Sequence, residues 1–338
     1  MNKNLNCSNN RIFEKFMNGN ISIKELFEEL SSLDNDNINN IINRKKTDCV
    51  QKNNNNIVNF YEYDREKLNE ILNELESLVG LNHIKNIIKE YIAFIKVQKM
   101  RRNYNLKCFP IVMHMIFKGN PGTGKTTVAR IIGKVFKEIG FLKNGNITEV
   151  DRGDLVGEYI GHTAQKTRKI INKSLGGVLF IDEAYSLARG GERDFGKEAI
   201  DTMVKSMEDH KEDLIIILAG YPDEMEYFLK SNPGLSSRFA IKLNFPDYKI
   251  DELIKIAEIM YKKREYILNK SSKYYIYKKL SEIRNNEQIN GNARSVRNFV
   301  ENSIRQHAKR IINNKKLTRS DLMYITKEDL IGEEFIND

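Results

Sequence analysis

A glycine-rich loop carries the residues of this chain that are best suited to bind a polyphosphate. Residues 119–126 read GNPGTGKT and match the pattern G-x-x-x-x-G-K-[ST] at every fixed position. Closely spaced glycines let backbone N–H groups turn toward phosphate oxygens, while the lysine reaches the β and γ phosphates and the threonine ligates Mg²⁺. The predicted ligands of a nucleoside triphosphate with Mg²⁺ are Pro121, Gly122, Thr123, Gly124, Lys125, Thr126 and Thr127.

Two acids, Asp182 and Glu183, follow the apolar segment GVLFI at residues 177–181. Carboxylates at the end of a buried strand cost free energy unless a partner compensates them. Beside such a loop, Asp182 would hold Mg²⁺ through water and Glu183 would polarise the attacking water as general base. Alone, an apolar run before Asp-Glu is more often the end of a strand in a solvated turn. The glycine-rich loop favours the catalytic interpretation, with Lys125 and Glu183 as catalytic residues.

The glycine-rich loop and the two acids are expected at the ends of strands, with helices following them in the chain. Apolar runs predict strands at residues 111–117, 146–150, 177–181, 214–219 and 239–245, and helical spacing predicts a helix over 127–136. Strands that alternate with helices imply a parallel sheet covered on both faces. Only helical patterns remain after residue 247. The predicted fold is therefore α/β, a parallel sheet flanked by helices and followed by a small α-helical domain.

The first part of the chain differs in composition from the remainder. Residues 1–60 contain 17 asparagines and are predicted to form a flexible arm. Within it, residues 22–30 combine a capping box with apolar side chains at helical spacing, which predicts one short amphipathic helix. Residues 63–100 predict two further helices that break at Gly80. We expect an arm over 1–60, an α/β nucleotide-binding domain over 61–246, and a helical domain with a tail over 247–338.

Composition excludes several classes of protein. The hydrophobic content of 40% is that of a globular chain, and three cysteines without a C-x-x-C pair predict neither a disulfide framework nor a zinc site. The longest apolar runs are strand-length, far below the roughly 20 residues that span a bilayer. We therefore expect a cytoplasmic protein without a membrane span. The net charge is +9, and +7 of it lies in residues 251–310. A solvated helical face is the favoured interpretation of that excess, so nucleic-acid binding is not expected.

In order and in detail, these motifs resemble the AAA+ ATPases, specifically the family that includes stage V sporulation protein K and red-type Rubisco activase. The resemblance covers residues 70–330. It rests on the two motifs above and on the segments LVGL at 78–81, DLVGEYIGHT at 154–163, LAGY at 218–221, NPGLSSRF at 232–239 and GNARSVR at 291–297. It implies a P-loop AAA+ domain with a helical lid, ATP hydrolysis, and a ring of identical subunits, a hexamer by resemblance.

The resemblance also implies roles for single residues. Arg238 matches the arginine finger, a cation delivered to the γ-phosphate of the neighbouring subunit. Arg294 matches the sensor arginine of the lid, and Val79 and Gly80 match the segment that meets adenine. One position departs from the wider AAA+ pattern. Tyr221 with its two preceding residues stands where many members carry a sensor asparagine, which leaves that role open.

A further segment concerns the substrate. Tyr159, Ile160 and Gly161 match the aromatic-apolar-glycine loop that polypeptide-translocating AAA+ rings project into a central pore. The alternative is that Tyr159 packs against its own domain. The leading hypothesis is an ATP-driven motor that remodels a polypeptide client, with spore formation favoured over a Rubisco client as its setting. The second hypothesis is a nucleotide-dependent switch whose basic lid binds nucleic acid or a protein partner.

Overall fold

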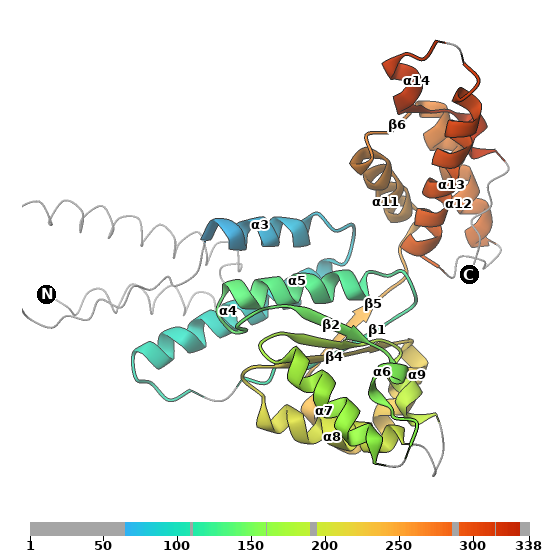
Figure 1. Cartoon of the computed structure of the whole chain (residues 1–338). Helices are drawn as coiled ribbons and strands as arrows, with labels where there is room; N and C mark the ends of the chain where they lie inside the picture. Colours follow the sequence, from blue (N-terminus) through green and yellow to red (C-terminus); the bar gives the residue numbers. More distant parts are fainter. Residues whose placement is uncertain are drawn as a thin grey trace, which may run out of the picture. The chain divides into compact units, whose positions relative to one another are not determined.

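A computed structural model of the chain describes residues 65–108, 111–159, 161–189, 195–285, 291–314 and 316–331, without the side chains of 283–285 (Figure 1). The predicted arm, its helix at residues 22–30 and the pore-loop residue Ile160 lie outside the described residues. The domain boundaries predicted from the sequence stay predictions.

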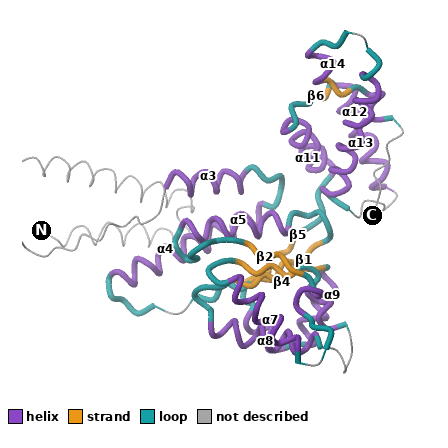
Figure 2. The backbone as a smooth tube through the Cα atoms, in the orientation of Figure 1, coloured by secondary structure: helices purple, strands orange, loops and turns teal. Residues whose placement is uncertain are grey.

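The five predicted strands form one parallel sheet in the order β2-β3-β4-β1-β5. Their bounds are β1 Met115–Gly119, β2 Ile147–Val150, β3 Val178–Ile181, β4 Ile215–Gly220 and β5 Ile241–Phe245 (Figure 2). The first strand begins four residues later than predicted. His114 explains this, because its ring Nδ1 accepts the N–H of Ile216 at 3.1 Å, a donor that backbone pairing would otherwise use.

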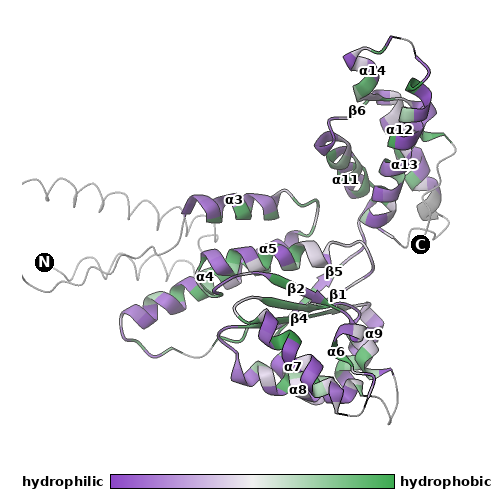
Figure 3. Ribbon diagram, in the orientation of Figure 1, coloured by the Kyte–Doolittle hydropathy of each residue, from purple (hydrophilic) through white to green (hydrophobic). Residues whose placement is uncertain are grey.

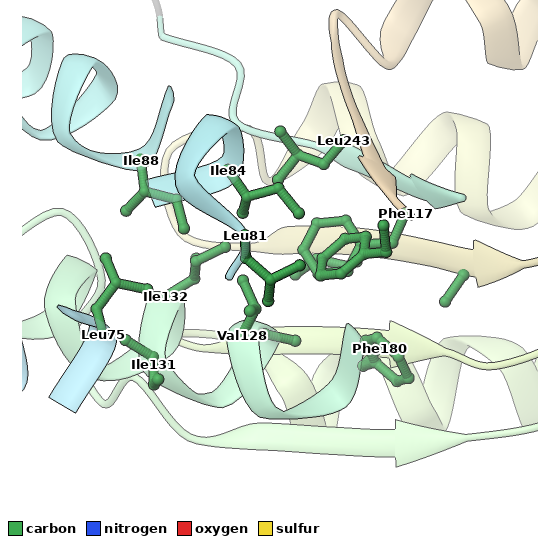
Figure 4. Close-up of a cluster of buried hydrophobic side chains, with 14 of the residues drawn as sticks. Leu75, Leu81, Ile84, Ile88, Phe117, Val128, Ile131, Ile132, Phe180 and Leu243 are labelled. Atoms are coloured by element: carbon green, nitrogen blue, oxygen red, sulfur yellow. The ribbon is translucent and has the colours of Figure 1, made fainter. Parts of the chain in front are cut away.

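Both faces of the sheet are buried at its central strands β1, β3 and β4, as the apolar runs predicted, whereas Lys242 and Asn244 of the edge strand β5 are exposed. Alternate residues of β4 belong to different core clusters, Ile215 and Ile217 to one and Ile216 and Leu218 to the other. This separation follows from the two-residue period of a strand. Helices α3, α4 and α5 cover one face, and α7 and α8 cover the other, with their apolar sides turned inward (Figure 3). Figure 4 shows Phe117 and Phe180 of the sheet in one cluster with side chains of α3, α4 and α5.

The helices of the α/β domain agree with the predicted pattern. Their bounds are α3 Arg65–Glu76, α4 Asn82–Asn103, α5 Lys125–Glu138, α6 Arg152–Leu155, α7 His162–Ser174, η1 Ala184–Ala188, α8 Gly196–Asp209, α9 Pro222–Ser231 and α10 Pro233–Arg238. The predicted break at Gly80 is confirmed, because Gly80 and Leu81 have φ values of 65° and 57° and so leave the right-handed helical region. The start of α5 is two residues earlier than predicted, at Lys125.

The second part of the chain is mainly helical. It consists of α11 Ile250–Lys263, β6 Ile267–Leu268, α12 Lys270–Asn285, α13 Ala293–Ile311, α14 Arg319–Met323, β7 Tyr324–Ile325 and η2 Lys327–Leu330. The prediction of helices alone was wrong here, since β6 and β7 pair in parallel. Strands of two residues are too short to show a periodicity. None of the helices in the described ranges is both long and apolar enough to cross a membrane.

Candidate nucleotide-binding site

The phosphate-binding loop (P-loop, residues 119–126) joins the end of β1 to the start of α5. Gly122 and Gly124 have φ values of 72° and 97°, a conformation that glycine adopts without strain. Thr123 donates its hydroxyl hydrogen to the Asn120 carbonyl at 2.7 Å and so closes the turn. The loop leads directly into the N-terminus of the 14-residue helix α5. Free N–H groups and the helix dipole at that end favour the binding of an anion.

Lys125 lies at the centre of a cluster of charged residues. Its Nζ donates to the carbonyl oxygens of Gly119 at 2.7 Å and Asn120 at 2.9 Å. Burial lowers the pKa of Lys125 below its ordinary value, Asp182 and Glu183 oppose that shift, and the Arg294 guanidinium adds to it. Because these three groups act on one ammonium, the structure brings together four of the residues predicted to form the site.

The two acids stand where β3 ends. The N–H of Asp182 donates to the Val150 carbonyl at 3.0 Å, which continues the ladder with β2 by one residue. The N–H of Glu183 donates to Oδ1 of Asp182 at 3.0 Å. Glu183 has φ 47° and ψ 43°, a left-handed conformation that costs a non-glycine residue about 1 kcal/mol or more. Both carboxylates are exposed, and the sharp turn directs the chain away from the sheet at this point.

The segment with Val79 and Gly80 lies beside the P-loop. A Cβ built on Gly124 would be 3.7 Å from Cδ1 of Leu81, and one built on Gly80 would be 2.5 Å from Oε1 of Glu252. Glu252 belongs to the first turn of α11. The predicted adenine segment thus runs between the start of α5 and the first helix of the lid.

Asn292 joins the lid to the P-loop, and the sequence did not single it out. Its side chain is 1% exposed. Nδ2 donates to Oδ1 of Asp247 at 2.8 Å and to the Pro121 carbonyl at 3.3 Å, and Oδ1 accepts the N–H of Tyr248 at 3.0 Å. Its backbone has φ 47° and ψ −128°, which is strained for any residue with a Cβ. The contacts made by the side chain offset this strain.

The linker between β5 and α11 supplies the other half of the junction. Both carboxylate oxygens of Asp247 accept from Nδ2 of Asn120 at 3.0 Å, and the Tyr248 hydroxyl donates to the Thr123 carbonyl at 3.1 Å. Burial raises the pKa of Tyr248 to about 12, so the hydroxyl keeps its hydrogen at physiological pH. The one local signal for these partners is that Asn292 stands two residues before the predicted sensor arginine.

Arg238 is held away from this cluster. It ends α10, and its guanidinium forms an ion pair with Glu208 of α8 and donates to the Gly234 carbonyl at 2.9 Å. Its Nε is buried and has no hydrogen-bond partner among the described residues. Within one chain, Arg238 therefore contacts its own domain and not Lys125.

Tyr159 lies on the loop between α6 and α7 and is 66% exposed. Its ring meets that of His162 edge to face, with centroids 5.5 Å apart, and Gly161 has φ 81°. The alternative that Tyr159 is packed into its own domain does not describe this structure. Tyr221 follows β4, and its ring centroid lies 6.1 Å from that of Tyr185.

Two family models match the chain. They are the AAA model, described as ATPase family associated with various cellular activities, at residues 115–247, and the AAA lid domain at residues 249–336. Stage V sporulation protein K of Bacillus subtilis is 53% identical over 269 residues, which cover 79% of this chain and 84% of that protein. The chain belongs to the AAA family of ATPases.

More distant relatives agree with this assignment. The CfxQ homolog of Galdieria sulphuraria is 42% identical over 85% of this chain and 95% of that protein. The chloroplastic ribulose bisphosphate carboxylase/oxygenase activase of Cyanidioschyzon merolae is 42% identical over 80% of this chain and 93% of that protein. Among solved structures, a RuvB mutant of Thermotoga maritima has a TM-score of 0.48 and 19% identity over 73% of this chain and 70% of that chain, too weak a likeness to add to the assignment.

As a member of this family the chain is an ATPase, with the parallel sheet and the lid that the sequence predicted. The residues present fit a Mg²⁺–nucleotide. Gly122 and Gly124 have the positive φ that lets the P-loop backbone turn around a phosphate, and a hydroxyl on Thr126 with a carboxylate on Asp182 supplies the oxygen ligands that Mg²⁺ prefers.

Proposed function

We propose that this ATPase is a motor that remodels a polypeptide client in a ring of identical subunits, a hexamer by its resemblance to the family. The supporting observation is that one charged cluster spans both domains. Lys125 and the two acids belong to the α/β domain, whereas Arg294 belongs to the lid. A nucleotide bound there would contact both domains, so its hydrolysis would change how the lid is held.

Each residue of the cluster has a chemical role in this proposal. Lys125 and the P-loop N–H groups hold the β and γ phosphates, and Thr126 with Asp182 holds Mg²⁺, which neutralises charge on the phosphates. Glu183 accepts a proton from the attacking water. Its exposed carboxylate at the strand end leaves room for that water.

Arg238 acts in trans in this proposal. Its ion pair with Glu208 is a surface pair, because the glutamate side chain is 64% exposed, and such pairs are worth about 0–1 kcal/mol. Arg238 can therefore leave Glu208 and contact the γ-phosphate bound to a neighbouring subunit at a small cost in free energy. The ring would supply the cation that each site lacks on its own.

Tyr159, with Ile160 and Gly161, contacts the client in this proposal. An exposed aromatic ring on a loop can hold an extended chain through side-chain contact without reading its sequence. The setting we propose is spore formation, since the relative named stage V sporulation protein K is 53% identical, whereas the activase is 42% identical.

The test compares two tyrosine variants in ATPase assays with unfolded casein as the probe. Tyr159→Ala should keep the melting temperature of the parent and lose stimulation by casein, measured relative to its own basal rate. Tyr227→Ala is the matched control, because Tyr227 is 74% exposed on α9. Full stimulation of Tyr159→Ala would contradict the proposal. Salt-dependent binding of DNA without stimulation by casein would favour the nucleotide-dependent switch instead.

A further inference from the structure

A hollow of 380 Å³ adjoins Tyr159 and takes no part in the nucleotide site. We call it the Tyr159 hollow; its lining residues are Gly157, Glu158, Tyr159, His162, Gln165, Lys166 and Lys169. Its lining comes from the loop after α6 and from the first half of α7, up to Lys169. An open hollow beside the residue proposed to contact the client is a place where client side chains can bind.

Hydrogen bonds connect the loop beside the hollow to α7. Lys166 donates its ammonium hydrogens to the carbonyls of Gly153 and Val156, and the buried hydroxyl of Thr167 donates to the Leu155 carbonyl at 3.0 Å. The N–H of Gly157 donates to the Thr163 hydroxyl at 2.9 Å. These bonds tie the loop to α7, so the hollow is preorganised.

Helix α7 presents a row of cations along one face. Lys166, Lys169 and Lys173, which we call the lysine stripe, recur at spacings of three and four residues and are all exposed. Residues at these spacings share a helix face. The helix has no acidic residue in its sequence HTAQKTRKIINKS. From His162 to Lys173 the face is about 16 Å long, which matches about five residues of an extended polypeptide.

The lysine stripe has donors available for a ligand. Within the described part of the chain, Lys169 and Lys173 form no ion pair. Lys166 uses two of its three N–H donors on the loop carbonyls, which are uncharged. Glu158 is the one acid in the lining and stands next to Tyr159.

We propose that the Tyr159 hollow and the lysine stripe bind acidic segments of the client polypeptide. The inference rests on the proposed function, since it assigns a substrate class to the loop that carries Tyr159. A peptide can place its carboxylates beside the lysines and a neutral side chain beside Glu158. A nucleic acid carries a charge at every nucleotide and would bring phosphates against that glutamate, which favours the peptide.

The experiment uses the full chain and three synthetic peptides of 20 residues. They share the same apolar positions and carry Glu, Gln or Lys at all others. At about 0.15 M salt the Glu peptide should stimulate ATP hydrolysis at a concentration roughly five-fold lower than the Gln peptide, and the Lys peptide should be weakest. The difference should shrink at about 1 M salt, because screening shortens the Debye length from about 8 to 3 Å.

Two variants locate the effect. Lys169→Gln removes one of the three lysines of the stripe and should reduce the difference between the Glu and Gln peptides from about five-fold to about three-fold, and Lys169→Glu should reduce it further. The matched control is Lys205→Gln, which removes one exposed lysine from α8 and should leave the five-fold difference intact. An undiminished five-fold selectivity in Lys169→Gln would overturn the inference.

The remaining outcomes separate the inference from the proposed function. Equal stimulation by the Glu and Gln peptides would overturn the inference and leave the polypeptide motor standing. Absence of stimulation by every peptide would overturn both. Displacement of the Glu peptide by a 20-nucleotide single-stranded DNA, with ATP hydrolysis stimulated by the DNA alone, would replace the polypeptide with nucleic acid as the ligand.

Discussion

Asn292 links the lid to the P-loop through one side chain, and its replacement by alanine should weaken both that junction and ATP binding. Alanine removes the bond to the Asp247 carboxylate, of a charge-assisted kind worth about 1.5–3 kcal/mol, and the bond to the Tyr248 N–H, worth about 1 kcal/mol. Alanine also inherits φ 47° and ψ −128°, which adds about 1 kcal/mol because asparagine tolerates positive φ better. Together these losses destabilise the junction by about 3.5–5 kcal/mol.

Glycine separates the hydrogen bonds from the backbone strain. Asn292→Gly loses the same side-chain bonds but adopts this backbone without a Cβ clash. It should therefore lie about 1–2 kcal/mol closer to the parent than Asn292→Ala. If Asn292→Ala destabilises the ATP-bound state by about 1.4 kcal/mol more than the free state, it should bind ATP about tenfold more weakly.

Two measurements test this reasoning, namely titration with ATP and hydrogen exchange of the Ala293 amide, which donates to the Gly122 carbonyl at 3.2 Å. Exchange at Ala293 should accelerate in Asn292→Ala. Arg297→Ala serves as control, because Arg297 is exposed on the same helix and should change neither quantity. A variant at Asn292 that melts lower yet keeps the parental ATP affinity and exchange rate would refute the junction. In that case Asn292 would contribute to the stability of the fold but not to ATP binding.

The other predictions concern turnover and pH. Lys125→Ala should abolish ATP binding in calorimetry, whereas Glu183→Gln should bind ATP and hydrolyse it at least about 100-fold more slowly; parental turnover would remove Glu183 as the base. Arg238→Ala should bind ATP but hydrolyse it poorly, and mixing it with Lys125→Ala should restore part of the activity, so mixed oligomers without rescue would contradict delivery in trans. Deletion of residues 1–60 should keep basal ATPase turnover within about three-fold, or roughly 0.6 kcal/mol in barrier height. Burial lowers the pKa of His114 to about 4, so below pH 6.5 the unfolded chain binds a proton that the folded chain does not. The free energy of unfolding should therefore fall by up to about 3 kcal/mol as pH falls from about 6.5 to 4, measured by thermal melts. His114→Asn should remove this loss.

Local patterns were enough to predict the sheet and the helices around it. The strand that ends in Asp182, and the loop and helix that carry Lys125, are each encoded in a few neighbouring residues. Their apolar spacing, glycines and flanking acids are all visible in a short window of sequence. Apart from the missed two-residue strands β6 and β7, the errors lie at element ends. His114 shortens β1 because its ring accepts the N–H of Ile216, 102 residues away. A short stretch of sequence cannot contain both of these residues.

The roles assigned to Arg238, Arg294 and Tyr159 stay predictions. The Arg294 guanidinium contributes to lowering the pKa of Lys125, after burial; Arg238 contacts Glu208, and Tyr159 is exposed. For Arg238, one chain cannot show its functional partner if that partner belongs to another subunit.

The amino-acid sequence alone determined the phosphate-binding chemistry, the α/β fold and the family, because these depend on residue types at short, fixed spacings. Tertiary structure alone identified the junction through Asn292, whose bond to the Pro121 carbonyl spans 171 residues, and the pairing of Asn120 with Asp247 across 127 residues. An asparagine is compatible with a surface turn as well as with a buried junction. Its partners are decided only when strand order and lid packing bring distant segments within hydrogen-bond distance of each other.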